Sequence, residues 1–134
     1  MRAPDSIADR LRECGIQPTP QRLKVAALLL AEPQHLTADQ ILARLDAAGV
    51  RVSKATVYNT LNLLAAKGVV RQLSVDGDRA WFDSNVSPHF HFQDVETGVI
   101  SDVSPQEVRF ERLPPPPPGM EYAGIELFIR LRRV

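Results

Sequence analysis

The sequence predicts an α+β protein, with a winged helix-turn-helix domain in residues 1–83 and a small α/β domain in residues 84–134. Three observations carry this prediction. The first half shows helical spacing with clear start and stop signals. An Asp-Gly turn then separates two β-rich runs, and the last third alternates apolar and polar residues as strands do. Because the chain has 134 residues, of which 44% are hydrophobic, it has room for one domain or two very small ones.

Four helices are expected in the first half, each opened by a side chain that can accept a hydrogen bond from the first turn. These caps are Asp5 or Ser6, Thr19 with Pro20 behind it, Thr37 in a capping box with Gln40, and Ser53. The helices end at or before Gly15, Pro33, Gly49 and Gly68. The residues expected to face the core are Ile7, Leu11 and Cys14, then Leu23, Ala27 and Leu30, then Ile41, Leu42 and Leu45, and finally Val57, Leu61 and Leu64.

The helical spacing changes to a strand pattern after Gly68. Residues 69–75 and 79–83 are rich in β-forming residues, and the Asp76-Gly77-Asp78 segment between them is a strong hairpin signal. Helices followed by such a hairpin form a winged helix-turn-helix. The helix that begins after Ser53 would then be the recognition helix.

The second domain is less regular. We expect strands over 89–95 and 99–103, a brief helix in 104–113, and an extended linker at the proline run 114–118. Residues 121–133 predict a last strand. Its buried face would carry Ile125, Leu127, Ile129 and Leu131. Three strands leave an apolar face and an edge open, so this domain is expected to form a homodimer.

Composition excludes several classes of protein. No apolar run is long enough to cross a bilayer, and the first ten residues lack the apolar segment of a signal peptide. The single cysteine, Cys14, excludes an internal disulfide framework and a cysteine-rich structural zinc site. We therefore expect a cytoplasmic protein. Its zero net charge is uneven, because residues 1–75 carry ten Lys and Arg against six Asp and Glu, whereas 76–134 carry six against ten. The basic first half suggests a polyanionic partner.

The start of the expected recognition helix has residue types suited to DNA. Ser53, Lys54 and the helix N-terminus can hold a phosphate. Thr56 and Tyr58 can contact thymine methyl groups, and Asn59 can bond a base edge. The alternative is an ordinary surface helix with a half-buried tyrosine, and the surrounding helix-turn-helix and wing favour DNA binding.

A second group of residues predicts a metal site. His89 and His91 are two apart on an expected strand, so both rings leave the same face. Asp83 and Asp102 end neighbouring strands and could add oxygen ligands, with His35 as a further imidazole. Such a mixed set suits Fe(II), Mn(II) or Zn(II). The alternative is an amphipathic strand that carries two surface histidines.

Several segments together resemble the ferric uptake regulator (Fur) superfamily, most closely its Irr and peroxide-regulator (PerR) branches. They are GIQPTPQRLKVAALLL, HLTADQILARL, VSKATVYNTLNLLAAKGVVRQLSVDG, WFDSNVSPHFHF, GVISDV and the terminal IELFIRLRR. The most specific is SKATVYNTL, followed at the family's spacing by Phe-Asp, His-x-His and Asp. The resemblance covers nearly the whole chain.

The resemblance implies a homodimeric winged-helix repressor that binds an AT-rich palindromic operator. It also implies one Fe(II) or Mn(II) per subunit at the hinge between the domains, with Zn(II) as a substitute in vitro. The family's metal ligands fall on His35, Asp83, His89, His91 and Asp102. Its DNA-contacting tyrosine falls on Tyr58, followed by Asn59, and a basic position that faces the DNA backbone falls on Arg22.

The sequence also departs from the family pattern. Asp94 and Thr97 stand where a first Cys-x-x-Cys pair is usual, and no second pair follows, so no structural zinc held by four cysteines is expected. Pro88 and Phe90 replace ligands of an additional site found in many Fur proteins. Cys14 is followed by glycine, so the Cys-Pro haem motif of some Irr proteins is absent.

The favoured hypothesis is therefore a metal-responsive repressor of iron homeostasis or peroxide stress. In the peroxide version, His35 or His89 would gain an oxygen atom when Fe(II) is bound. The alternative is an Irr-like, haem-responsive iron regulator that binds DNA without added metal and takes haem through His89 and His91. An enzyme is not expected, because the sequence has no Gly-rich loop and no nucleophile paired with a base.

Overall fold

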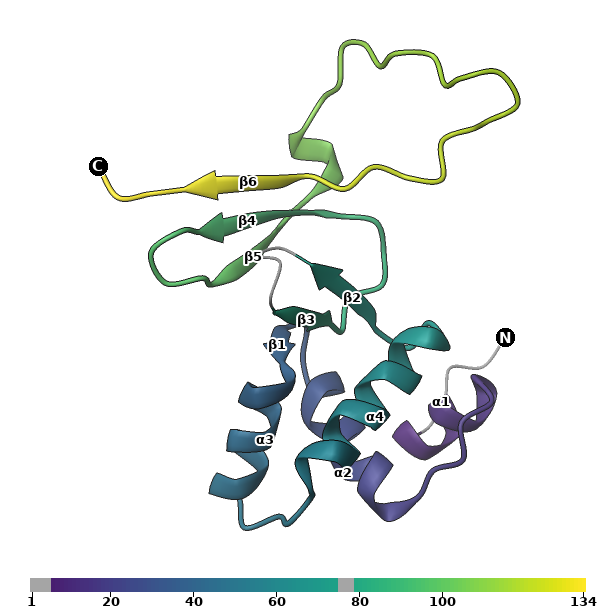
Figure 1. Cartoon of the computed structure of the whole chain (residues 1–134), viewed down its shortest axis with the longest axis vertical. Helices are drawn as coiled ribbons and strands as arrows, with labels where there is room; N and C mark the ends of the chain where they lie inside the picture. Colours follow the sequence, from purple (N-terminus) through teal and green to yellow (C-terminus); the bar gives the residue numbers. More distant parts are fainter. Residues whose placement is uncertain (1–5, 75–78) are drawn as a thin grey trace. The chain divides into compact units, whose positions relative to one another are not determined.

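A computed structural model describes residues 6–74 and 79–134 (Figure 1). The chain divides into two compact units between Val86 and Ser87, three residues after the expected boundary, and each unit is considered by itself. The expected cap Asp5 and the expected Asp76-Gly77-Asp78 turn lie outside the described residues. Every described helix is too short or too polar to cross a bilayer.

The described part of the first unit has four α-helices, and their caps confirm the sequence prediction. They are α1 (Ile7–Glu13), α2 (Pro20–Leu30), α3 (Ala38–Ala47) and α4 (Lys54–Ala66). The side chains of Ser6, Thr19, Thr37 and Ser53 each accept a hydrogen bond from a backbone N–H of the first turn. The capping box at Thr37 is complete, since the Gln40 side chain accepts from the Thr37 N–H in return.

The helices pack around one apolar core. Val57, Leu61 and Leu64 of α4 are fully buried, as their spacing predicted. The prediction for α2 was wrong in part: Leu23 and Leu30 pack against the core as expected, but Ala27 is exposed, and the fully buried residues are Val25, Ala26 and Leu29. All six residues from Val25 to Leu30 are apolar, so periodicity could not choose a face in this half of α2. Contacts of α2 with α1, α3 and α4 choose it instead.

A three-stranded antiparallel sheet completes the first unit. Its strands are β1 (His35–Thr37), β2 (Arg71–Ser74) and β3 (Ala80–Asp83), in the order β1-β3-β2. The pairing of β2 with β3 confirms the predicted wing strands. The sequence did not predict β1, because three residues carry no usable alternation. This strand matters for the site, since its register sets His35 directly opposite Asp83.

The second unit is a three-stranded sheet with a single helical turn. Its elements are β4 (Phe90–Asp94), β5 (Ile100–Val103), the 3-10 helix η1 (Pro105–Glu107) and β6 (Phe128–Leu131). The strand order is β5-β4-β6, with β5 antiparallel and β6 parallel to β4. Between η1 and β6 the chain forms a long loop without helix or strand, which contains the proline run (Figure 1).

The last strand differs from its prediction. It covers four residues rather than most of 121–133, and Ile125 and Leu131 are exposed where a buried face was expected. The physical reason is its place at the edge of the sheet, where β4 is its only strand neighbour among the described residues of this chain.

Candidate functional site: two ligand groups and the recognition helix

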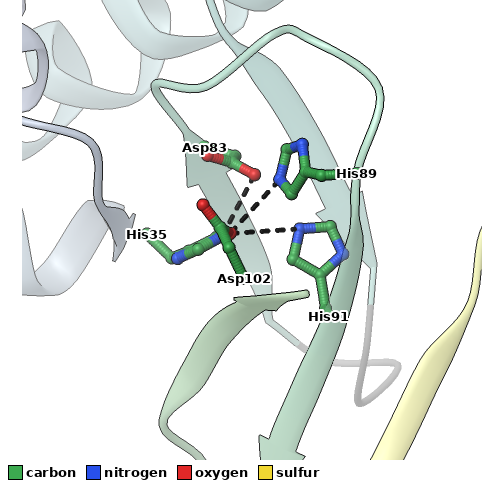
Figure 2. A group of neighbouring side chains, drawn as sticks. All are labelled: His35, Asp83, His89, His91 and Asp102. Carbon is green, nitrogen blue, oxygen red and sulfur yellow. Dashed lines mark ion pairs between the residues drawn. The ribbon is translucent and has the colours of Figure 1, made fainter. Parts of the chain in front are cut away.

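The first group of candidate ligands lies in the first unit and consists of His35 and Asp83 (Figure 2). Their pairing across β1 and β3 brings His35 Nε2 to 3.1 Å from Asp83 Oδ2. The Asp83 side chain has no exposed surface, and its Oδ1 accepts a hydrogen bond of 2.9 Å from the Asn85 N–H. A carboxylate buried this deeply needs a positive partner to remain charged.

Backbone and side-chain hydrogen bonds hold this pair in place. The Gln34 N–H donates to Ser84 Oγ at 3.0 Å, and the Ser84 N–H donates back to the Gln34 carbonyl at 3.1 Å. The Gln34 amide also donates to the carbonyl oxygens of Leu28 and Leu29 at the end of α2. Gln34 therefore ties the residue before His35 both to the residue after Asp83 and to a helix end. The roles of Gln34 and Ser84 could not be predicted from sequence, because only the strand register reveals them.

The second group lies in the second unit and consists of His89, His91 and Asp102 (Figure 2). His89 Nδ1 lies 2.6 Å from the Ser87 carbonyl oxygen, which can only accept, so Nδ1 carries the proton. His89 Nε2 is thereby the ring nitrogen left to bind a cation, and it lies 3.3 Å from Asp102 Oδ1. His91 pairs with Asp102 across β4 and β5, with 3.9 Å between Nε2 and Oδ1.

The two imidazoles of this group are packed rather than free in solvent. The side chains of His89 and His91 are 4% and 3% exposed, and their ring centres are 4.5 Å apart. This contact agrees with the prediction that both rings leave the same side of the strand. The His91 ring also stacks on Phe128 of β6, with 5.1 Å between centres and 16° between planes. The role of Phe128 could not be predicted from sequence, since the β4–β6 pairing joins residues far apart in the chain.

The donor set as a whole fits a divalent transition metal. Each of the five residues offers one ligand atom: an imidazole nitrogen from each histidine and a carboxylate oxygen from each aspartate. Imidazoles suit iron and zinc, and carboxylates add affinity for manganese. One group belongs to each unit, so the assignment of all five to a single ion stays a prediction.

The candidate DNA-contacting residues of α4 lie at its N-terminal end. Lys54, Tyr58 and Asn59 are exposed, whereas Thr56 is half-buried. The Ser53 hydroxyl accepts from the Thr56 N–H at 3.1 Å and donates to the Thr56 hydroxyl at 2.8 Å. The Lys54 ammonium lies 3.7 Å from an Asp39 carboxylate oxygen and 5.8 Å from the centre of the Tyr58 ring.

Arg22 lies near the same face of the first unit. Its guanidinium donates to the Gln17 carbonyl oxygen at 3.0 Å, and its backbone N–H donates to the capping hydroxyl of Thr19. A hollow of about 220 Å³ joins this end of α2 to α4. The residues around it are Thr19, Gln21, Arg22, Thr56, Asn59 and Thr60. Three of the predicted DNA contacts, Arg22, Thr56 and Asn59, therefore line one concave surface that also contains a helix N-terminus.

Comparisons with known proteins agree with this architecture. The model of the ferric uptake regulator family matches residues 13–113. The peroxide-responsive repressor PerR of Staphylococcus aureus is 36% identical over 110 residues, which cover 81% of this chain and 74% of the relative. The structure of the ferric uptake regulator of Pseudomonas aeruginosa with manganese is 30% identical, with a TM-score of 0.70 and coverage of 92% of this chain and 95% of that one. The ferric uptake regulator of Francisella tularensis with iron shares the fold, with a TM-score of 0.68 and 24% identity over 89% of this chain and 92% of that one.

Proposed function

We propose that this chain, which belongs to the ferric uptake regulator family, senses its signal through one Fe(II) or Mn(II) ion per subunit. As a member of this family it is a metal-responsive transcriptional repressor of iron homeostasis or peroxide stress, and not an enzyme. The ligands in our proposal are His35, Asp83, His89, His91 and Asp102. We expect it to act in the cytoplasm, where its operator would be.

The buried Asp83 carboxylate carries this proposal. The carboxylate is fully buried with an imidazole nitrogen 3.1 Å away, so an oxygen and a nitrogen donor lie side by side where a divalent cation would stabilise the buried charge. His89 supports the same reading, since the proton on its Nδ1 leaves Nε2 as a ligand atom. When bound, the metal supplies a divalent positive charge that neutralises Asp83 and Asp102. Zn(II) is expected to substitute in vitro, and a structural zinc held by four cysteines is not part of the proposal.

The proposed output is a change in operator affinity. Regulators of this family bind DNA as dimers, and we propose that this one binds an AT-rich palindrome. Its two α4 helices would then enter major grooves about 34 Å apart, one turn of DNA. Ligands drawn from both units would fix the orientation of the DNA-binding unit. Loss of the metal would release that orientation and shift the population away from the binding form.

The DNA contacts in this proposal are Arg22, Ser53, Lys54, Thr56, Tyr58 and Asn59. The N-terminus of α2 and Arg22 would hold a phosphate beside the hollow, and Ser53 and Lys54 would hold another. Thr56, Tyr58 and Asn59 would reach base edges. Salt dependence would separate the two kinds of contact, because only the phosphate contacts release counterions.

Fluorescence anisotropy tests the proposal. The full chain is titrated onto an AT-rich palindromic duplex at fixed salt, with Mn(II) and then with a chelator. Tight binding to the duplex is expected with Mn(II) and not with the chelator. His89→Ala and Asp102→Asn should keep the fold by circular dichroism and lose this metal dependence. Glu107→Gln, which changes an exposed acidic residue of the same unit, should behave as wild type. Wild-type operator binding by His89→Ala would refute the proposal.

Two further outcomes identify the signal. Binding that survives the chelator, with a Soret shift when haemin is added, would favour haem taken by His89 and His91, as in Irr-like regulators. For a peroxide signal, His35 or His89 should gain one oxygen atom when Fe(II)-loaded protein meets dilute peroxide, and should not do so with Mn(II). Peptide mass spectrometry reads this change directly.

A further inference from the structure

The carboxylate of Asp94, the last residue of β4, makes two separate sets of contacts. Its Oδ1 accepts hydrogen bonds from the N–H groups of Glu96 at 2.9 Å and Thr97 at 3.2 Å, which shape the turn before β5. Its Oδ2 accepts from the Arg133 guanidinium at 2.6 Å. The same guanidinium nitrogen lies 3.6 Å from Glu96. One side chain thus joins the β4–β5 turn to the end of the chain.

Arg133 lies just beyond the C-terminal end of β6. The N-terminal end of β6 contacts the candidate ligand His91. The Val95 N–H donates to the Leu131 carbonyl at 3.0 Å, next to the ion pair. The His91 N–H donates to the Leu127 carbonyl, also at 3.0 Å. Phe128 is the register partner of His91, and its ring stacks on the imidazole. The position of β6 therefore decides whether the Phe128 ring packs against His91.

Backbone pairing with β4 holds β6 along its length, and side chains add little to it in the described part of the chain. This strand has four residues, it follows a long irregular loop, and its side chains are half-buried or exposed. Exposed ion pairs usually contribute little. In this pair the Arg133 side chain is 63% exposed, but the Asp94 side chain is only 20% exposed and is already fixed by the turn. The hydrogen bond from Arg133 is also the main reason that the pKa of Asp94 is lowered from 3.8 to about 2.

We infer that the Asp94–Arg133 pair is a metal-independent latch that holds β6 against β4 and thereby positions His91 for metal binding. Asp94 and Arg133 are positioning residues in this inference, since neither belongs to the five candidate ligands. The metal half of the inference rests on the function proposed above. The latch half concerns the metal-free sheet and can be tested without any ion.

Amide hydrogen exchange of the metal-free full chain tests the latch. Asp94→Asn keeps an oxygen acceptor for the turn but removes the charge that binds Arg133. It should speed exchange at the Val95 and His91 amides about fivefold or more, because both donate to carbonyls in or next to β6. Arg133→Gln should do the same, and Arg133→Lys should restore part of the protection. Arg132→Gln is the matched control, since Arg132 is exposed and makes no ion pair among the described residues.

Calorimetric titration with Mn(II) tests the positioning role on the same variants. Asp94→Asn and Arg133→Gln should weaken Mn(II) binding about tenfold, as loss of residues that orient a ligand does. Phe128→Leu should weaken it similarly while leaving Val95 exchange unchanged, because it removes only the stacked ring.

The outcomes separate the two claims. Unchanged exchange in Asp94→Asn would overturn the latch. Faster exchange with unaltered Mn(II) affinity would overturn the positioning of His91. Failure of the wild-type chain to bind Mn(II) would refute the proposed metal function, while the exchange data would still decide the latch.

Discussion

Asp83→Asn separates a metal ligand from a purely structural aspartate, because the two roles predict opposite results. Asparagine has the shape of aspartate without its charge. Its amide oxygen can still accept from the Asn85 N–H, and its amide nitrogen can donate to His35 Nε2 across the present 3.1 Å contact. The geometry of β3 should therefore survive the change.

Two terms set the expected size of the effect. Without metal, removal of the Asp83 charge relieves a desolvation penalty of several kcal/mol. The loss of the contact between the Asp83 carboxylate and His35 offsets this gain. The free energy of unfolding of Asp83→Asn should then lie within about 1.5 kcal/mol of wild type. With Mn(II) at about 100 times its Kd, the wild-type chain gains about 2.7 kcal/mol. This gain corresponds to a rise in Tm of about 10 °C for a chain of this size.

Thermal unfolding followed by circular dichroism, with Mn(II) and with chelator, measures both terms. Wild type should show the full rise in Tm on adding Mn(II), and Asp83→Asn should show almost none. Asp46→Asn, an exposed change on α3, should keep the full rise. A full Mn(II) shift in Asp83→Asn would refute Asp83 as a ligand. A loss of more than about 3 kcal/mol without metal would show that the buried carboxylate is structural.

Three further predictions concern other parts of the chain. Lys54→Ala should weaken binding to all duplexes alike and lower the slope of log affinity against log salt concentration by about 1. Asp39→Asn should tighten binding, because it frees the Lys54 ammonium 3.7 Å away. Anisotropy at several salt concentrations would show both effects. Thr37→Ala should lower the free energy of unfolding in urea by about 1 kcal/mol, because it removes the capping box, whereas Thr37→Ser should stay near wild type. An unchanged urea midpoint in Thr37→Ala would contradict this prediction. Because the pKa of Asp94 is lowered from 3.8 to about 2, its stabilising effect is complete above about pH 4 and is lost as the pH falls toward 2. Amide exchange of β6 should show this acid step in wild type and lack it in Arg133→Gln.

Much of the first unit could be predicted from local sequence. The caps at Ser6, Thr19, Thr37 and Ser53 are local signals, because a cap acts on the N–H groups two or three residues ahead. The strands β2 and β3 followed from composition. The family was also predictable, since SKATVYNTL and the residues spaced after it are specific, and the comparisons confirm it.

Tertiary structure decided the features that depend on distant contacts. Ala27 faces solvent because packing, and not the period of the apolar run from Val25 to Leu30, sets the rotation of α2. β1 exists only by pairing with β3, more than forty residues later, and that pairing sets His35 opposite Asp83. The sequence by itself determined which side chains could hold a metal or contact DNA. Tertiary structure determined the contacts that surround the metal candidates, because strand register and edge position arise from long-range backbone pairing: Gln34 with Ser84, Phe128 on His91, and Arg133 on Asp94.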